Sequence, residues 1–474
     1  MSDMTLDWDG GRFSVAMAAE VDRILRAHLD KGPNQEDLCF AYWRPSQGAS
    51  QTTAIISELV LPRDDDRILQ GNVAFNPQYL KRVLSGRPEG TGIALIHSHL
   101  GPGWQGMSRD DVVAERDRLA GPVWGRSGLP LVGLTSGTDG AYSARRWVRT
   151  DPKCFRRHEA ESVRIVGRSM RITRHPMIAV PAVSASQVAT ASVWGEAVQA
   201  ELVRTRIGII GLGSVGSIVA EALARVGFAD LTLIDFDVLE ERNRDRTAGA
   251  SEADVVAGLS KVQVAARNAR RSATASELSL HLAPHSLLDP KGLAAALDCD
   301  VLFSCVDRPW PRFLMNSIAY AHLIPVIDGG IAARVKPDGT PLHVDWRIHT
   351  IGPGNACLVC QDALRRSDVA LDRAGKLDDP DYIRGLSEAD RDRLSRRNVF
   401  PFSLSVAAHE VLHLVGLLSG MERIGGCGSQ AYHAYPGKMV VSQPVCEPDC
   451  EFVALTGSAA DQRSNLRPSV PMTD

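Results

Sequence analysis

Three glycines in the segment IGIIGLGSVGS constrain the local fold of this chain more tightly than any other feature. Gly211, Gly213 and Gly216 follow the apolar run 207–210 and open the helix-like stretch 214–226. Asp235 ends the next apolar run, 19 residues after the last glycine. This spacing is typical of a Rossmann-type turn, in which glycines let the backbone approach a phosphate and the acid accepts from a ribose hydroxyl. By itself the pattern fits NAD, FAD or ATP, and a tight turn that only packs a helix on a strand is the alternative.

The apolar runs around this turn predict a parallel sheet. They lie between helix-like stretches and do not alternate with polar residues, at 207–210, 231–234, 301–304 and 324–327. Strands buried on both faces predict an α/β fold with a mostly parallel sheet. The charged stretch 368–397 is either an exposed helical insertion or a mobile loop.

Polar residues that follow these strands favour ATP chemistry. They are Asn243 and Arg246 after DFDVLEE, Lys261 in GLSKVQVAAR, and Asp307 at the end of VLFSCVD, with Arg312 and Asn316 beyond it. Adenylation needs cations around a triphosphate and an acid to hold magnesium, because charge builds on the departing pyrophosphate. A hydride-transfer enzyme needs no such cluster, although Lys261 and Arg246 taken singly would be ordinary surface charges.

Together these positions resemble the ThiF/MoeB superfamily, the adenylating domains of ubiquitin-activating enzymes. The likeness runs from Trp194 to Gly420 and includes LTLIDFDVLEERNRDR, IPVIDGG and GPGNACLVC. It implies a Rossmann-like domain that binds ATP and magnesium and that forms a homodimer. By position it also implies three roles: Asp235 binds ribose, Asp307 holds magnesium, and the phosphates are contacted by Asn243, Arg246 and Lys261.

The same resemblance implies a structural zinc site. Several members of the superfamily bind zinc through two cysteine pairs, which here would be Cys357 with Cys360 and Cys446 with Cys450. The second pair is spaced by three residues rather than two, and free core cysteines are the alternative. Nine cysteines in a chain of this length suit reduced thiols and metal ligation better than a disulfide framework.

Activating enzymes often carry a thioester-forming cysteine before the last conserved helix. The corresponding stretch here, LSRRNVFPFSLSVAAHEVL, has no cysteine. Thioester transfer would therefore need Cys427 or one of the four paired cysteines. Cys305 is explained as strand packing beside Asp307.

A second chemical signature lies in IALIHSHLGPGWQGMSRDD. His97 and His99 end an apolar run, and residues two apart in a strand point to one face, so both can hold one ion. Ser108 then opens a helix-like segment whose first turn offers Asp111 as a third ligand. Three protein ligands leave one position for water, as at catalytic zinc. Ser-x-x-Asp is also a helix-capping arrangement, and cap and ligand can coexist.

Hydrolysis at such a site needs a base for the attacking water and an acid for the leaving amine. One carboxylate can serve in both roles. Glu36, just before the apolar run 38–43, is the first candidate, and Glu58 in ISELVLP is the second. Either residue could be an ordinary surface glutamate.

His-x-His, eight residues and Ser-x-x-Asp, with an upstream glutamate, resemble the JAMM/MPN (JAB) zinc isopeptidases over residues 10–175. The resemblance implies a mixed α/β domain with zinc on His97, His99 and Asp111. It also implies Glu36 as the acid/base and Ser108 as a group that helps to stabilise the oxyanion. Residues 38–43 depart from the glycine-containing first strand that is usual in that family.

The chain is therefore expected to comprise a JAMM/MPN domain at 1–175, a linker at 176–190 and a ThiF/MoeB-type domain at 191–474. Helical spacing over 13–29 predicts a leading helix, followed by strands at 38–43 and 54–61, and the pattern closes near 163–172. The linker is rich in Pro, Ala and Ser.

Charge and hydropathy exclude other classes of protein. A formal charge of -3 argues against a nucleic-acid binder, although 156–171 is a local basic patch of a kind that is mostly solvated surface. The N-terminus lacks a basic-then-apolar signal, and no run of about 18 uncharged apolar residues occurs. We expect a cytoplasmic protein that binds neither nucleic acid nor membrane.

Both resemblances concern the C-terminus of a ubiquitin-like protein, which one domain would cut and the other would adenylate. Such a fusion resembles components of prokaryotic ubiquitin-like conjugation systems, where a conjugating enzyme would be a further partner. Two alternatives remain open. One is activation of a sulfur-carrier protein, with the hydrolase freeing an amino-acid product, and the other is an inactive scaffold that binds a ubiquitin-like protein.

Overall fold

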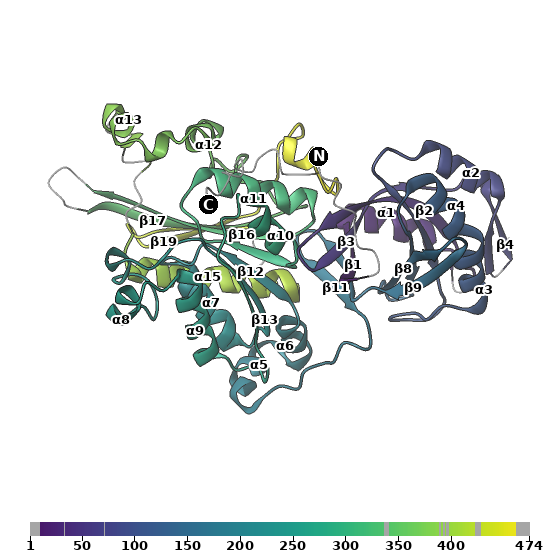
Figure 1. Ribbon diagram of the computed structural model, residues 1–474, viewed down its shortest axis with the longest axis horizontal. Helices are drawn as coiled ribbons and strands as arrows, with labels where there is room; N and C mark the ends of the chain where they lie inside the picture. Colours follow the sequence, from purple (N-terminus) through teal and green to yellow (C-terminus); the bar gives the residue numbers. More distant parts are fainter. Residues whose placement is uncertain are drawn as a thin grey trace. The chain divides into compact units, whose positions relative to one another are not determined.

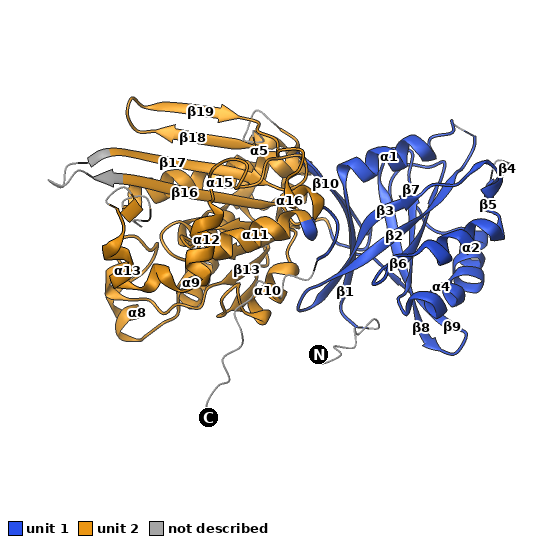
Figure 2. Cartoon of the chain, turned by 90° about the horizontal axis from the view of Figure 1, so that it is seen from above, with its two compact units in different colours: residues 1–179, 321–323, 456–460 blue, residues 180–320, 324–455, 461–474 orange. Residues whose placement is uncertain are grey.

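The computed structural model describes residues 10–32, 34–70, 72–335, 341–387, 390–391, 394, 398–421 and 428–460. The chain divides into two compact units, drawn in blue and orange in Figure 2. Unit 1 comprises residues 1–179, 321–323 and 456–460, and unit 2 comprises the remaining residues. The predicted domain limits 1–175, 176–190 and 191–474 stay a prediction.

Unit 1 is built on a nine-stranded mixed sheet with the order β11-β10-β1-β3-β2-β6-β7-β8-β9. β1 is parallel to β3 and β10, β6 is parallel to β7, and the other neighbours are antiparallel. The strands are β1 Arg12–Ala18, β2 Leu38–Gln47, β3 Gln51–Val60, β6 Gly92–Ser98, β7 Leu131–Ser136, β8 Tyr142–Asp151, β9 Cys154–Glu159, β10 Ser162–Val166 and β11 Met170–Arg174. β4 Arg67–Gln70 and β5 Asn72–Phe75 form a separate hairpin.

Helices cover both faces of this sheet (Figure 1). α1 Ala19–Leu29 packs on one face, and α2 Pro77–Gly86 and α4 Ala120–Ser127 pack on the other. α4 continues from α3 Arg109–Val112 through the π-helical segment Val113–Leu119. Within β6, Ala94 and Ile96 join the α1 core, whereas Ile93 and Leu95 join the α2 and α4 core. Because side chains alternate along a strand, His97 points to the same face as Leu95. The first histidine therefore faces the side of the sheet that α3 and α4 cover.

The predicted leading helix over 13–29 is only partly correct. The chain is a strand from Arg12 to Ala18 and becomes helical at Ala19. β1 lies in the sheet between two parallel neighbours, and six of its seven residues are buried. A strand buried on both faces is continuously apolar, so its pattern also satisfies the spacing of a helix.

Unit 2 is built on an eight-stranded mixed sheet with the order β14-β13-β12-β15-β16-β17-β18-β19. The first five strands in that order are parallel, and β17, β18 and β19 are added antiparallel. The strands are β12 Arg206–Ile210, β13 Asp230–Ile234, β14 Ser279–Ala283, β15 Val301–Ser304, β16 Val326–Val335, β17 Pro341–Ile351, β18 Ser429–His433 and β19 Lys438–Ser442.

Helices again pack on both faces of the parallel strands. α10 and α11 share a core with Ile210, Leu302 and Val326, while α15 packs on β16, β17 and α7, and α7 packs on α9. Their bounds are α7 Gly216–Val226, α9 Lys261–Ser272, α10 Pro290–Leu297, α11 Pro309–Ala321 and α15 Phe400–Ser419. Shorter helices are α5 Val188–Trp194, α6 Glu196–Val203, α8 Glu252–Val256, α12 Arg366–Arg373, α13 Pro380–Gly385 and α16 Glu451–Ala454.

Three of the four strands predicted for this unit are confirmed, since β12, β13 and β15 contain 207–210, 231–234 and 301–304. β16 begins at Val326 rather than at residue 324 and continues to Val335, where it pairs with β17. Edge strand β14 was not predicted because most of its side chains are exposed. The charged stretch is helical in α12 and α13, while 388–389, 392–393 and 395–397 lie outside the described residues.

α15 is long and apolar enough to cross a membrane by length and composition alone. Ten of its residues are buried against unit 2, including Glu410, which is fully enclosed. Burial raises the pKa of Glu410 well above its usual range, which favours the uncharged acid. These properties are those of a core helix that packs on a sheet.

Two buried histidines predict that unit 2 loses stability in acid. Burial lowers the pKa of both His349 in β17 and His413 in α15 to about 4. An unfolded histidine has a pKa of about 6.5 and takes up a proton that the folded one refuses, so stability falls as the pH drops below that value. We expect a loss of about 2 kcal/mol per histidine between pH 7 and pH 5.

Urea denaturation of wild type and His413→Gln over this pH range measures the effect. The variant should show a shallower decline in the free energy of unfolding. His281→Gln, in which an exposed histidine is replaced, should follow the wild type. A decline in His413→Gln as steep as that of the wild type would contradict the interpretation.

Candidate functional site

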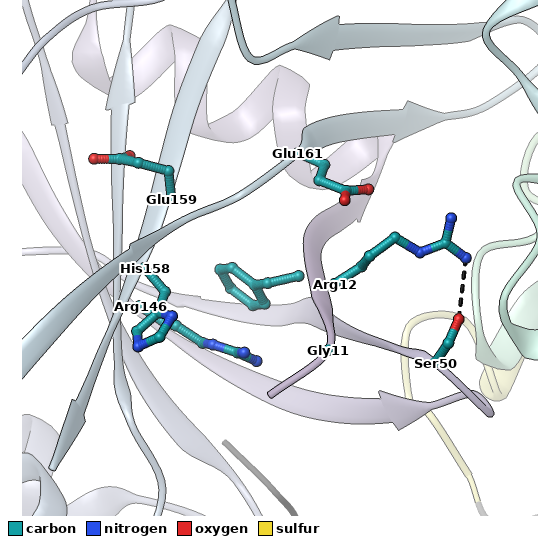
Figure 3. Close-up of a pocket in the computed structure, with 8 residues that line it drawn as sticks. Gly11, Arg12, Ser50, Arg146, His158, Glu159 and Glu161 are labelled. Atoms are coloured by element: carbon teal, nitrogen blue, oxygen red, sulfur yellow. Dashed lines mark hydrogen bonds between the residues drawn. The ribbon is translucent and has the colours of Figure 1, made fainter. Parts of the chain in front are cut away.

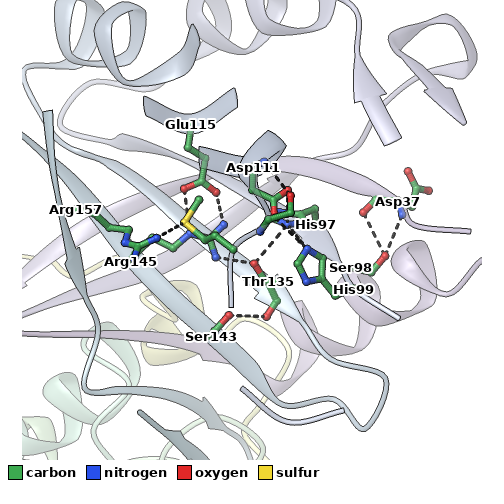
Figure 4. Close-up of polar contacts among 12 residues, drawn as sticks. Asp37, His97, Ser98, His99, Asp111, Glu115, Thr135, Ser143, Arg145 and Arg157 are labelled. Atoms are coloured by element: carbon green, nitrogen blue, oxygen red, sulfur yellow. Dashed lines mark hydrogen bonds and ion pairs between the residues drawn. The ribbon is translucent and has the colours of Figure 1, made fainter. Parts of the chain in front are cut away.

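Three potential metal ligands meet at the end of β6 (Figure 4). Nε2 of His97 lies 3.2 Å from Nε2 of His99 and 3.4 Å from Oδ1 of Asp111. Nε2 of His99 lies 3.2 Å from Oδ2 of Asp111. Ligands held at 2.0–2.1 Å by a tetrahedral zinc ion lie about 3.3 Å from one another. The spacing of the three side chains is therefore compatible with one zinc ion.

Local structure explains how a strand and a helix bring these ligands together. Ser108 caps α3, because its Oγ accepts a hydrogen bond from the Asp111 amide at 3.1 Å. The Ser108 amide donates to Oδ2 of Asp111 at 2.7 Å. The cap thus fixes the Asp111 carboxylate beside the two histidines, and its role as a metal ligand stays a prediction. Since the Ser108 hydroxyl accepts in this cap, its own proton stays available for donation.

Glu36 lies within the electrostatic field of the same three residues. Burial raises the pKa of Glu36, and the charges of His99 and His97 partly offset that rise. A carboxyl group with a raised pKa suits a group that accepts and later returns a proton. Glu58, the second candidate, is exposed on β3 and pairs in register with Tyr42.

The neighbouring carboxylate, Asp37, holds this segment against the histidine strand. Its amide donates to Oγ of Ser98 at 2.9 Å, and the Ser98 amide donates to the Asp37 carbonyl at 2.9 Å. The fully buried Asp37 side chain pairs with Arg67 at 2.7 Å and lies 3.7 Å from Nζ of Lys31. Ser98, between the two histidines, therefore ties the Glu36 segment to the ligands.

The glycine loop of unit 2 combines packing constraints with open space. A Cβ on Gly216 would lie 1.9 Å from the Gly211 carbonyl oxygen, and one on Gly211 would lie 2.7 Å from that of Cys305. Gly211 also has a φ of +86°. A Cβ on Gly213, in contrast, would meet nothing within 4 Å. Folding requires the two outer glycines, and the middle one faces space that a phosphate could enter.

Asp235 and Lys261 lie beside this loop. Oδ2 of Asp235 accepts from the Leu212 amide at 2.6 Å, and Oδ1 accepts from the Asp237 amide at 2.8 Å. Burial raises the pKa of Asp235, and Lys261 lowers it again in part. Nζ of Lys261 lies 2.6 Å from Oδ2 of Asp237. The acid and the cation predicted to bind nucleotide are therefore joined through Asp237.

The other residues predicted to bind nucleotide or magnesium are Asn243, Arg246 and Asp307, and their contacts are with residues near them in the chain or with Arg312. Oδ1 of Asn243 accepts from the Glu240 amide at 3.1 Å, and Arg246 contacts the Arg242 carbonyl and Asp245, each at 2.8 Å. Asp307 is exposed beyond β15. Burial lowers the pKa of the partly buried Arg312, but Asp328 and, less strongly, Asp307 raise it above its usual value.

Four cysteine thiols converge at a second candidate metal centre. Sγ of Cys357 lies 3.7 Å from Sγ of Cys450, close to the separation of about 3.8 Å expected between sulfurs at 2.3 Å from a tetrahedral zinc ion. The Cys357 amide donates to Sγ of Cys446 at 3.1 Å, and the Cys360 amide donates to Sγ of Cys357 at 3.3 Å. A hydrogen bond from the Cys357 thiol leads the interactions that lower the pKa of Cys446 to about 5. The unequal spacing of the two pairs does not prevent convergence.

Comparison with known proteins identifies the family to which unit 2 is similar. The ThiF family matches residues 185–427, just over half of the chain. The chain belongs to the ThiF family. Among curated relatives, the molybdopterin-synthase adenylyltransferase of Escherichia coli (strain K12) is 30% identical over 168 residues, which are 35% of this chain and 62% of that protein. Ubiquitin-like modifier-activating enzyme 5 of Drosophila willistoni is 27% identical over 169 residues, or 33% and 39% of the two chains.

A solved structure, E. coli MccB with succinimide, is similar over 54% of this chain and 68% of that one, at 20% identity and a TM-score of 0.42. The chain spans less than two thirds of the length of the two curated relatives that it matches. The ThiF match contains the glycine loop and the first cysteine pair, and it ends before the second pair.

Within the ThiF region, Asn398 connects the segment before α15 to the glycine loop. Its Nδ2 donates to Oγ of Ser214 at 2.7 Å and to Oγ of Ser403 at 2.9 Å. Asn398 lies in LSRRNVFPFSLSVAAHEVL, the stretch in which activating enzymes often carry a thioester cysteine and which has none here. Cys427 lies outside the described residues, and the paired cysteines form the candidate metal centre.

A surface hollow in unit 1 lies apart from the residues that the sequence motifs predict. A polar hollow of about 530 Å³ in unit 1 is lined by residues of β1, β8 and β9 and their loops (Figure 3). Arg12 donates to Oγ of Ser50 there at 3.1 Å, and Arg146 stacks on Phe13. This hollow contains none of the residues predicted from the sequence motifs.

Sequence reasoning did not identify the residues that support the two sites. Asp37 and Ser98 are examples in unit 1, and Asp237 is one in the ThiF region. Another is Asp328, which is fully buried and accepts from Arg312 at 2.9 and 2.5 Å and from Ser304 at 2.7 Å. Their position in the sequence could have indicated two of these residues. Asp237 in DFD and Asp328 in VIDGG each lie beside the end of a predicted strand.

Metal analysis tests both candidate centres without a substrate. We expect purified wild type to hold about two zinc ions per chain and folded His97→Ala/His99→Ala about one, as measured by elemental analysis. Cys446→Ser/Cys450→Ser should also lose one zinc ion and should unfold more easily, because metal bound to a structural site contributes to folding. Unchanged zinc in the histidine variant would remove the metal from unit 1.

Proposed function

We propose that this protein is a bifunctional modification factor for a ubiquitin-like protein. Unit 1 would be a JAMM-type zinc (iso)peptidase that processes or removes the modifier, and the ThiF region would adenylate its C-terminus with ATP and magnesium. The single observation that carries the proposal is that His97, His99 and Asp111 lie at zinc spacing within the field of Glu36, in a chain that also belongs to the ThiF family.

For the peptidase reaction, His97, His99 and Asp111 would hold the metal. Zinc supplies Lewis acidity, which activates a water and polarises the carbonyl to be attacked. The Glu36 carboxylate takes the proton from the attacking water and returns it to the departing amine, so the C–N bond breaks with no net change at Glu36. The Ser108 hydroxyl donates toward the developing oxyanion.

For adenylation, the glycine loop would receive the phosphates and Asp307 would hold magnesium. A carboxylate oxygen of the modifier attacks the α-phosphorus of ATP, the bond between α- and β-phosphates breaks, and pyrophosphate leaves. Asp235 would accept from the ribose, while Lys261, Arg246 and Asn243 would contact phosphates. Open space at Gly213 and the ammonium of Lys261 beside the loop support this assignment.

The names of the relatives support two classes of substrate. One relative is a ubiquitin-like modifier-activating enzyme, and the other is an adenylyltransferase of molybdopterin synthase. The second favours the alternative in which a sulfur-carrier protein is activated. A thiocarboxylate product would identify sulfur transfer, whereas a protein conjugate, formed with a separate conjugating enzyme, would identify modification. Homodimerisation and a cytoplasmic location are further parts of the proposal, and an inactive scaffold is the outcome if neither reaction occurs.

Cleavage should depend on unit 1 alone. His97→Ala should reduce hydrolysis of ubiquitin-like and sulfur-carrier proteins bearing a C-terminal extension to the uncatalysed background, because a ligand is lost. Mass spectrometry of the released peptide measures this. The variant should retain pyrophosphate exchange, and loss of both activities in a folded protein would show that the sites are not independent.

Adenylation should depend on Asp307. Asp307→Ala should lower ATP–pyrophosphate exchange with the same panel of carrier proteins by about 100-fold or more, since magnesium would no longer be held against the departing charge. Peptide release should stay at the wild-type rate. Exchange that survives the substitution would assign the magnesium to another acid.

A further inference from the structure

A buried ion pair connects the helix of the third ligand to the sheet. Glu115 and Arg145 are 0% and 1% exposed. Nε of Arg145 donates to Oε2 of Glu115 at 3.0 Å, and Nη2 donates to Oε1, so the pair is bidentate. The Trp147 indole donates to the same Oε2 at 2.7 Å. Both carboxylate oxygens of Glu115 therefore accept hydrogen bonds inside the protein.

The pair reaches both halves of the candidate zinc site. Glu115 is four residues after Asp111 on the same continuous helical segment. On the other side, Nη1 of Arg145 donates to Oγ1 of Thr135 at 2.6 Å (Figure 4), and Thr135 pairs with His97 in the register of β7 and β6. One guanidinium thus holds the Asp111 helix at a set distance from the histidine strand.

The backbone around Glu115 is arranged for this contact. The segment changes from α-helical to π-helical at Val113, and the Ala120 amide bonds to the Glu115 carbonyl five residues earlier. π-Helical turns are rare and are frequently found at functional sites. The wider turn changes the direction of Glu115 relative to Asp111, which a regular helix would fix.

The sheet below has a gap for the pair. A Cβ on Gly133 would lie 2.4 Å from Oε2 of Glu115 and 2.6 Å from Nε of Arg145. Gly133 has the ordinary extended backbone of strand β7, so its need for glycine is steric rather than conformational. Only a residue without a side chain leaves room for both charges beside β7.

We propose that Glu115 and Arg145 are positioning residues that set the distance between Asp111 and the two histidines, and thereby the affinity of unit 1 for zinc. The inference rests on the proposed metal centre. Outer groups that orient ligands typically change metal affinity by about 10- to 100-fold when they are removed. A pair that only stabilised the fold would leave affinity unchanged once stability was restored.

An apolar replacement separates these two roles. Exchanging a buried ion pair for hydrophobic residues of similar volume is often neutral or favourable for stability. Glu115→Met/Arg145→Met should therefore fold with a melting temperature near that of the wild type, yet it lacks the directional bonds. Glu115→Gln, which keeps the shape of the side chain, is a second variant that is expected to lose affinity several-fold. Arg116→Gln is the matched control, because Arg116 lies on the same helical segment in an exposed pair with Asp117.

The experiment titrates metal-free full-length protein with Co²⁺ alone. Thiolate-bound Co²⁺ absorbs strongly in the near ultraviolet and reports the cysteine site. Both sites absorb in the visible, so the histidine site is read from the visible bands that remain after the spectrum of His97→Ala/His99→Ala is subtracted. We expect the double variant to bind Co²⁺ at the histidine site about 10- to 100-fold more weakly, with the cysteine signal unchanged and Arg116→Gln like the wild type. If the double variant and Glu115→Gln both bind Co²⁺ at the histidine site as tightly as the wild type, the positioning role is overturned and the metal centre stays intact. A wild-type visible spectrum identical to that of His97→Ala/His99→Ala would overturn the metal centre itself.

Discussion

Burial of strands on both faces is the constraint on which both candidate sites depend. In β6, Ile93 and Leu95 enter one core while Ala94 and Ile96 enter the other, so the strand can neither rotate nor shift by one residue. His97 is the next residue on the first of these faces. In unit 2 the parallel strands β12, β13 and β15 are held in the same way, and the glycine loop, Asp235 and Asp307 follow their ends. Apolar packing therefore fixes where the polar chemistry begins.

Two neighbouring carboxylates in unit 1 differ in their ion pairing and in their pKa. Asp37 is fully buried and held by Arg67 and by backbone bonds around Ser98, whereas Glu36 beside it is only partly buried and has a raised pKa. The first residue anchors the segment, and the second remains able to exchange a proton. The ThiF region repeats the arrangement, because Asp237 binds Lys261 while Asp235 receives backbone amides. In each case a structural acid determines the position of the candidate functional acid.

The sequence was sufficient for those features that depend on local spacing. Alternation along a strand brings His97 and His99 together, the cap brings Asp111, and the glycine spacing predicts the turn after β12. Strand β1 was mistaken for helix because a continuously apolar strand also satisfies helical periodicity. The partnership of Glu115 with Arg145 was beyond reach for a different reason. Thirty residues separate the two, and nothing in either neighbourhood specifies that β8 and the π-helical segment face each other.

Spacing along the chain also gives the two candidate metal centres a different expected contribution of the metal to folding. The ligands of the histidine site lie within 15 residues, on a strand and a capped helix whose own packing already brings the donors to zinc spacing. Cys357 and Cys450 are 93 residues apart, and Cys446 and Cys450 stand on a C-terminal segment that packs through Phe452 against Tyr320. An ion held by all four thiols would close that long loop and remove chain entropy from the unfolded state. An ion at the cysteine site would therefore support the fold, whereas the donors of the histidine site are placed by the packing of their own strand and helix.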